Sequence, residues 1–148
     1  MTQAKATLRM KRTFEASAQA VFDAFTSEEV MRRWWHAGRD WETPEATVDL
    51  RVGGEVRVLM RNPHEDVRYG GGGRYTEIDP PSRLAFTWVW HDDEDGVEQL
   101  IEVDFVEADG ATTITFTHSG LWDEESLPSF EDGWGKCFAN LARVLQSS

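Results

Sequence analysis

The stretch LAFTWVW at residues 84–90 determines how the rest of the chain is interpreted. Its large apolar side chains, Leu84, Phe86, Trp88 and Trp90, fall on every second residue. Because successive side chains of a β-strand point to opposite faces, this alternation predicts a strand with one heavily aromatic face. Such a face has to be covered by another element, so a packing partner is expected elsewhere in the chain.

Strands and tight turns continue on both sides of this stretch. Upstream, Gly53-Gly54 and residues 62–66 are typical of turns, and downstream Asp109-Gly110 is a strong hairpin signal. Short connections of this kind join antiparallel neighbours, which predicts a meander with one polar and one apolar face. The expected strands cover residues 8–14, 48–52, 56–60, 69–78, 84–90, 101–105 and 114–118.

Helices are expected before and after the meander. Ser17 and Ser27 are suited to cap two short helices that follow the first strand. After Gly120 the apolar spacing becomes helical, and Pro128 is compatible with a first helical turn. The stripe that predicts this long C-terminal helix consists of Trp134, Cys137, Phe138, Leu141 and Leu145.

The predicted architecture is a single α+β domain over residues 1–148. The long helix is the only expected element able to cover the apolar face, so a curved antiparallel sheet of about six to seven strands would wrap around it. No internal repeat or linker divides the chain, and 148 residues is an ordinary size for one domain.

Composition excludes several kinds of partner. The 27 acidic and 15 basic residues give a formal net charge of −12, which repels the phosphates of nucleic acids and anionic membranes. No apolar run reaches membrane-spanning length, so membrane insertion is not expected. The single cysteine, Cys137, allows no internal disulfide, and no cluster of His, Cys, Asp and Glu has metal-ligand spacing. We therefore expect a cytoplasmic protein without a metal or cofactor.

The order of the predicted elements resembles the helix-grip fold of START-like proteins, the SRPBCC superfamily, which birch-pollen-allergen-like proteins share. A further set of sequence blocks covers residues 12–14, 16–17, 21–22, 34–35, 49–54, 77–81, 83–84, 86–88, 117–121 and 133–134, with Leu141 and Leu145. These blocks are similar to those of activator of heat-shock-protein-90 (Hsp90) ATPase homologues, and they occur in that family's order. The resemblance implies this fold, a small-molecule pocket between sheet and helix, and a stress-related role. The family's founding member has a second domain, which we do not expect in a chain of this length.

We predict that a hydrophobic or amphipathic small molecule binds between the aromatic face and the long helix. By strand parity His118 points inward with Phe116, and ordinary core packing is the alternative explanation for the aromatic residues. The four glycines at residues 70–73 are expected to open a bulge or to widen the cavity mouth. The predicted ligand-binding residues are Trp34, Val58, Trp88, Trp90, Phe105, Phe116, His118, Trp122, Trp134 and Phe138.

Two other functions are compatible with the resemblance. A polyketide-cyclase-like enzyme would need His118 and a second inward ionisable group, Arg57 or Glu77, although strand parity points Arg57 away from Val58. A co-chaperone would instead act on the ATPase of Hsp90. No catalytic residue is assigned, and the sequence favours binding over catalysis. An exposed edge strand could also support a homodimer.

Overall fold

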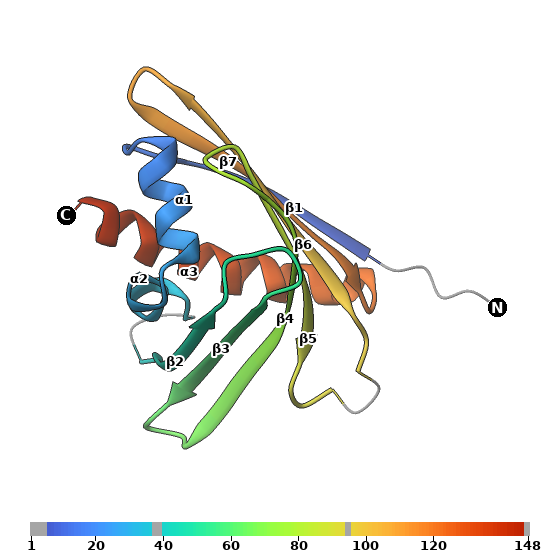
Figure 1. The fold of residues 1–148 in the computed structure, drawn as a ribbon. Helices are drawn as coiled ribbons and strands as arrows, with labels where there is room; N and C mark the ends of the chain where they lie inside the picture. Colours follow the sequence, from blue (N-terminus) through green and yellow to red (C-terminus); the bar gives the residue numbers. More distant parts are fainter. Residues whose placement is uncertain (1–5, 37–39, 94–95, 147–148) are drawn as a thin grey trace.

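The computed structural model describes residues 6–36, 40–93 and 96–146, and Figure 1 shows their arrangement. Seven strands and three α-helices confirm the predicted α+β class and the helix-grip arrangement. In chain order the elements are β1 (Ala6–Phe14), α1 (Ala18–Thr26), α2 (Glu28–Trp34), β2 (Glu42–Val48), β3 (Glu55–Asn62), β4 (Val67–Asp79), β5 (Arg83–Trp90), β6 (Gln99–Ala108), β7 (Ala111–Leu121), the short 3₁₀ helix η1 (Glu124–Ser126) and α3 (Leu127–Gln146).

The strands form one antiparallel sheet in the order β1-β7-β6-β5-β4-β3-β2. The sheet curves around α3, which lies across its concave side, and α1 and α2 stand at one end of that helix (Figure 1). Strands β1 and β2 are the two edges of the sheet, and a homodimer through either edge stays a prediction. No helix in the described part of the chain is long and apolar enough to cross a membrane.

The two short helices begin where the sequence predicts. The hydroxyl of Ser17 accepts a hydrogen bond from the backbone N–H of Ala20 at 3.1 Å, and that of Ser27 accepts one from Val30 at 3.4 Å. These bonds satisfy backbone donors that have no partner within a first helical turn. Both caps are therefore confirmed, and they place α1 and α2 directly after β1.

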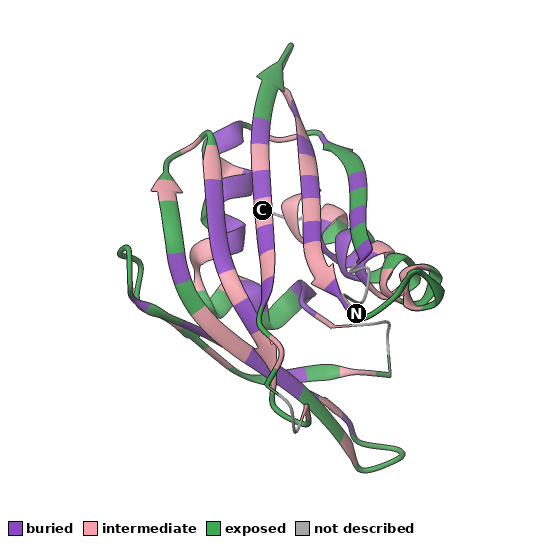
Figure 2. Ribbon diagram, turned by 90° about the vertical axis from the view of Figure 1, so that its right-hand side faces the viewer, coloured by how far each residue is buried: buried purple, intermediate pink, exposed green. Residues whose placement is uncertain are grey.

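Buried and partly exposed residues alternate along the central strands, as Figure 2 shows. The inward side chains of β5, β6 and β7 meet those of α1, α2 and α3 in one core. Some of its aromatic rings pack edge-to-face, as between Phe22 and Phe105 at 5.4 Å and between Phe116 and Phe138 at 5.2 Å. The largest fully buried side chains are Trp34, Trp88, Tyr75, Phe22, Phe86, Phe116 and Phe138.

One predicted strand is displaced. Residues 48–52 alternate like a strand, but β2 ends at Val48, and Leu50 and Val52 are 45% and 68% exposed. The chain turns here because the N–H of Gly54 bonds to the carbonyl of Arg51 at 2.8 Å and Gly53 adopts a φ of 86°. Glycine reaches this left-handed region without strain, so the turn overrides the apolar alternation.

The glycine run at residues 70–73 does not open the sheet as expected. It lies inside β4 and pairs regularly with β3, from Leu59 opposite Gly70 to Val56 opposite Gly73. The space left by the missing side chains is filled, since a β-carbon on Gly71 would lie 2.6 Å from the indole of Trp88. The run therefore lets β5 and its side chains approach β4 closely, and the irregularity in the β4–β5 pairing lies further along β4, after Tyr75.

Replacing Tyr75 by phenylalanine is expected to raise the free energy of unfolding by about 1 kcal/mol, because an unpaired buried hydroxyl costs free energy. Tyr75 is 1% exposed, and its hydroxyl has no hydrogen-bond partner among the residues that the structure describes. Burial also raises the pKa of this phenol well above its ordinary value. Urea denaturation would measure the change, with Tyr69→Phe at a 44% exposed position as the matched control. A loss of stability in Tyr75→Phe alone would show that the hydroxyl has a partner.

Candidate ligand-binding site

An aromatic pocket of about 280 Å³ lies between α3 and the neighbouring ends of β3, β4 and β5. Its walls come from separate parts of the chain: the residue after α2, the residue before β2, three strands and the first half of α3. Aromatic rings make up most of the lining. The lining residues are Trp35, Trp41, Met60, Tyr69, Trp90, Ser129, Phe130, Gly133, Trp134 and Cys137.

The rings of the pocket contact one another across these elements. Trp41 lies against Tyr69 with ring centroids 5.6 Å apart, Trp35 against Trp134 at 5.3 Å, and Trp90 against Phe130 at 6.3 Å. Neighbouring rings at such distances stabilise each other's positions. The pocket is therefore lined by pairs of rings, each pair joining two segments that are distant in sequence.

The end of α2 is tied to α3, and this places Trp35. The side-chain amide of Asn140 donates to the carbonyls of Trp34 at 3.4 Å and His36 at 3.0 Å. The hydroxyl of Thr43 donates to the carbonyl of Trp35 at 2.7 Å. These bonds hold the backbone of residues 34–36, so the Trp35 ring stacks on Trp88 at 5.3 Å and faces the pocket.

A buried hydrogen-bonded chain lies behind two of the lining indoles. The indole N–H of Trp134 donates to Nδ1 of His118 at 3.2 Å, and Nε2 of His118 lies 2.6 Å from Oε1 of Gln99. The indole N–H of Trp90 donates to the same oxygen at 3.2 Å. We call these four residues the indole relay. It connects the sheet to α3 and fixes the orientation of both rings.

The relay determines the protonation state of His118. An indole N–H only donates, so Nδ1 of His118 accepts and the ring proton lies on Nε2, which donates to Gln99. His118 is 0% exposed, and burial lowers its pKa to about 4. The imidazole is therefore neutral at neutral pH with both nitrogens engaged, which leaves no free lone pair for a general base.

Only two of the ten residues predicted from the sequence line the pocket, namely Trp90 and Trp134. Val58 is buried in β3 beside a second, polar hollow, and Trp122 is 40% exposed after β7, where its ring meets Phe130 at 5.8 Å. The other six belong to the packed core, at 5% exposure or less: Trp34, Trp88, Phe105, Phe116, His118 and Phe138.

Sequence reasoning missed most of the lining. Met60 and Tyr69 are register partners on β3 and β4, so strand parity could have placed them on the concave face. Trp35 and Trp41 carry no such signal, because both lie outside the regular elements. Phe130 falls on the first turns of α3, ahead of the stripe that predicted the helix.

The ionisable groups of the pocket are few. Tyr69 and Cys137 are the only titratable side chains among its lining residues. Burial raises the pKa of the Cys137 thiol to about 12, so it stays protonated and packs as an apolar group. No group of three or more metal-binding side chains occurs within residues 6–36, 40–93 and 96–146.

The structure does not assemble the enzyme constellation weighed from the sequence. Arg57 and Glu77 are exposed on the outer face of the sheet, whereas His118 is buried on the inner face. Glu77 instead accepts a hydrogen bond from Arg83 at 3.0 Å. His118, Arg57 and Glu77 therefore cannot act on one ligand in this arrangement.

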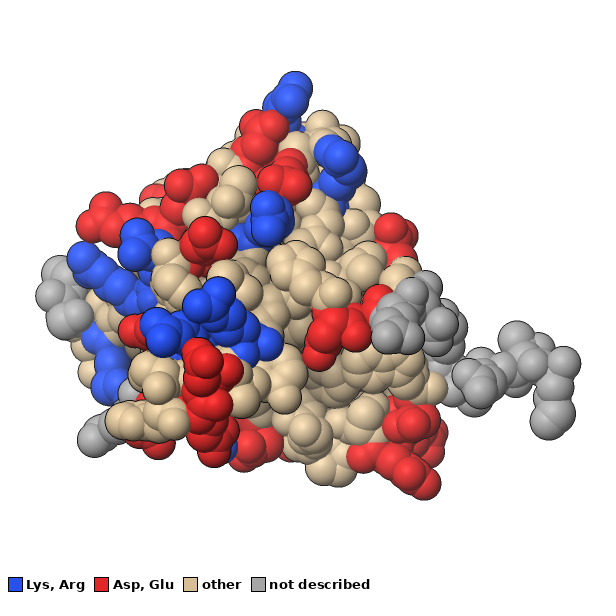
Figure 3. All heavy atoms as spheres, turned by 90° about the horizontal axis from the view of Figure 1, so that it is seen from below, with Lys and Arg blue, Asp and Glu red and all other residues tan. Residues whose placement is uncertain are grey.

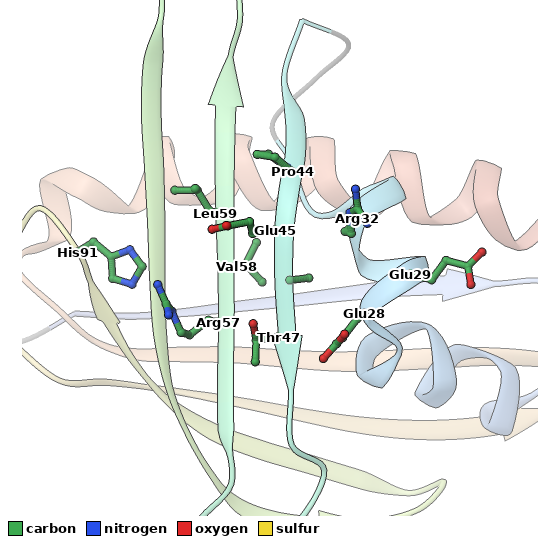
Figure 4. A pocket seen from close by; sticks show the side chains of 11 residues that line it. Glu28, Glu29, Arg32, Pro44, Glu45, Thr47, Arg57, Val58, Leu59 and His91 are labelled. Carbon is green, nitrogen blue, oxygen red and sulfur yellow. The ribbon is translucent and has the colours of Figure 1, made fainter.

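A larger hollow of about 560 Å³ lies along β2 and β3, against α2 (Figure 4). Its charged side chains do not converge. The Glu28 carboxylate accepts from the N–H of Val48 at 2.8 Å, Arg32 donates to the carbonyl of Thr43 at 3.4 Å, and Glu29 points away from the others (Figure 4). These contacts join α2 to β2, so the aromatic pocket is the stronger candidate for a binding site.

The fold and the pocket together define a helix-grip domain with an aromatic cavity beneath its long helix. The chain belongs to the family of activator of Hsp90 ATPase homolog 1-like proteins, whose sequence model matches residues 15–146. The family resemblance stated from the sequence blocks is thereby confirmed.

Solved structures agree with this assignment. The AHSA1 protein from Silicibacter pomeroyi is 31% identical, with a TM-score of 0.83 over 95% of this chain and 98% of that one. Protein CV1439 from Chromobacterium violaceum has a TM-score of 0.85 at 20% identity, over 94% and 96% of the two chains. DynU16, a protein of the dynemicin biosynthetic locus, has a TM-score of 0.73 at 18% identity, over 95% of this chain and 47% of its own. The latter two show the fold alone. No curated protein matches the sequence.

Proposed function

We propose that this protein binds a small, flat and largely apolar molecule in the aromatic pocket. The observation that carries the proposal is the lining itself, in which Trp35, Trp41, Tyr69, Trp90 and Trp134 surround one cavity. Small-molecule sites are mostly apolar concavities of about 300–1,000 Å³ with few polar groups. At about 280 Å³ the pocket suits a ligand of modest size.

Binding is better supported than catalysis. The pocket has no carboxylate, imidazole or amine among its lining residues, and His118 is engaged behind it in the indole relay. An acid or base must reach the proton that it transfers, directly or through one water. A stress-related role and a cytoplasmic location are further proposals, which rest on the family resemblance and the composition.

A neutral fluorescent probe, N-phenyl-1-naphthylamine, is expected to bind with a micromolar dissociation constant. Trp41→Ala should weaken binding by about fivefold or more, because aromatic anchors in pockets commonly contribute more than about 1 kcal/mol. Trp41 is only partly buried, so its removal spares the core. Probe fluorescence in a titration measures both affinities, and circular dichroism confirms that the variant is folded.

Trp122→Ala is the matched control for this experiment. Trp122 is 40% exposed and contacts Phe130 without lining the pocket, so its loss should leave the affinity for the probe unchanged within about twofold. No saturable binding to the unaltered protein, or equal losses in both variants, would refute the proposed site.

Family membership favours one second candidate, a co-chaperone that acts on Hsp90. The measurement is the ATPase rate of Hsp90 from the same organism with and without this protein. Stimulation that persists in Trp41→Ala would separate a chaperone-binding surface from the pocket. No stimulation at excess protein would exclude this function.

A further inference from the structure

We infer that the aromatic pocket selects organic cations, such as amines or quaternary ammonium compounds with an aromatic body, over carboxylates of the same size. The inference rests on the proposed function, because it assigns a charge to the small molecule that the pocket is proposed to bind. It follows from three observations. The lining has aromatic rings and no positive charge, the indole N–H donors of the relay are already engaged, and the protein carries a net negative charge.

The lining provides aromatic faces without a positive charge. Six of its residues are aromatic, and none is Lys, Arg or His. A cation is attracted to the face of an aromatic ring, most strongly to that of tryptophan, whereas a buried carboxylate needs a cation or several donors. Because six rings line the pocket, a cation bound there would have several aromatic neighbours.

The indole relay removes two of the donors that an anion would use. The N–H groups of Trp90 and Trp134 are both committed to buried acceptors, Gln99 and His118. Since His118 is neutral, it adds no positive charge behind the wall. His36, next to Trp35, is half-buried and hydrogen-bonded to the hydroxyl of Thr43. Burial lowers the pKa of His36, and the positive charge of Arg143 lowers it further.

Among the described residues close in sequence to the lining, four basic side chains are turned away from the pocket or paired. Arg61 follows the lining residue Met60, and Arg68 precedes the lining residue Tyr69. Strand alternation places both arginines on the outer face of the sheet. Arg61 pairs with Glu42 at 3.5 Å and with Asp66 at 3.9 Å. On α3, Lys136 pairs with Asp132 at 3.1 Å, and on α2 Arg33 pairs with Glu29 at 3.4 Å.

Exposed acidic residues are also close in sequence to the lining. Asp40 precedes Trp41, Asp92 follows Trp90 by two residues, and Glu131 follows Phe130, all three at exposed positions. Figure 3 shows the molecule from below, with basic side chains in its left and upper parts and with acidic and uncharged surface at its lower right. Together with the net charge of −12, this distribution attracts cations and repels anions.

Three ligands that share a naphthalene ring test the inference: 1-naphthylmethyl-trimethylammonium, the neutral 1-naphthylmethanol, and 1-naphthylacetate. Calorimetric titration is expected to show the cation binding about tenfold more tightly than the alcohol, and the carboxylate more weakly than both. Binding of the alcohol without a gain for the cation overturns the inference and leaves the proposed function standing. Binding of none of the three overturns both.

The variant Trp41→Leu separates cation–π attraction from general apolar contact. Leucine retains apolar bulk but has no aromatic face, so the affinity for the cation should fall by about fivefold or more while that for the alcohol falls less than about threefold. The control Trp122→Leu should change neither affinity, because Trp122 does not line the pocket. Equal losses for the cation and the alcohol in Trp41→Leu would contradict a role for the ring face.

Discussion

Gly73→Ala is expected to destabilise the protein by about 3 kcal/mol, the upper end of the usual cost of overpacking. A β-carbon at Gly73 would lie 1.9 Å from the carbonyl oxygen of Thr87 and 2.4 Å from its carbon. These are backbone atoms of the adjacent strand β5, so no side-chain rotation relieves the contact. One of the two strands would have to shift, which would disturb the packing of Trp88 on β4. Urea denaturation with linear extrapolation measures the change.

Gly135→Ala provides the matched control in the same protein. Gly135 lies inside α3, and the nearest atom to an added β-carbon is Nη2 of Arg12 at 3.7 Å, an ordinary contact. Alanine loses less backbone entropy than glycine on folding, so this variant should be more stable by about 0.5–1 kcal/mol. Similar effects of the two substitutions would contradict the close approach of β4 and β5.

The second large effect is a loss of stability in mild acid that depends on His118. Burial lowers the pKa of this imidazole to about 4 in the folded protein, against 6.5 for an ordinary histidine. The unfolded chain therefore binds a proton at a higher pH than the folded chain does, and stability falls as the pH decreases. This contribution is fully present above pH 6.5 and is lost between pH 6.5 and about 4. The difference of about 2.5 pKa units corresponds to about 3 kcal/mol.

The structural cause can be tested with His118→Gln. Protonation of Nδ1 would place a second donor against the indole N–H of Trp134, whereas a glutamine amide keeps a donor and an acceptor and does not titrate. Between pH 6.5 and 4, both proteins lose stability, but the unaltered protein should lose about 3 kcal/mol more of its free energy of unfolding than this variant does. His64→Gln, at an exposed turn position, should follow the unaltered protein. Parallel curves for all three proteins would show that His118 is not buried in the neutral form.

The elements that the sequence predicted correctly depend on residues close to one another in the chain. Ser17 and Ser27 cap their helices through bonds that span three residues, and the alternation at residues 84–90 is that of β5. Residues 48–52 are the exception, because their alternation competes with a turn at Gly53. Periodicity is a reliable guide only where no turn signal interrupts it.

The site was much less predictable than the fold. Trp88 and Trp90 have the same parity on the same strand, yet Trp88 is 0% exposed beneath Trp35 and beside Gly71, while Trp90 lines the pocket. Parity identifies the face of a sheet that a side chain occupies, but not how completely a helix covers that face. For Trp88 that cover is Trp35, which follows α2 and is far from Trp88 in sequence.

The aromatic alternation at residues 84–90 by itself determined a strand with an apolar face. The apolar stripe of the C-terminal helix determined that a helix covers this side of the sheet. Both follow from the regular geometry of a strand or helix, which acts over a few residues. Only the tertiary structure decided that Trp90 and Trp134 are joined through Gln99 and His118, and that Trp41 and Tyr69 complete the pocket. The physical reason is that these contacts depend on how the sheet curves around α3, which no local pattern of side chains specifies.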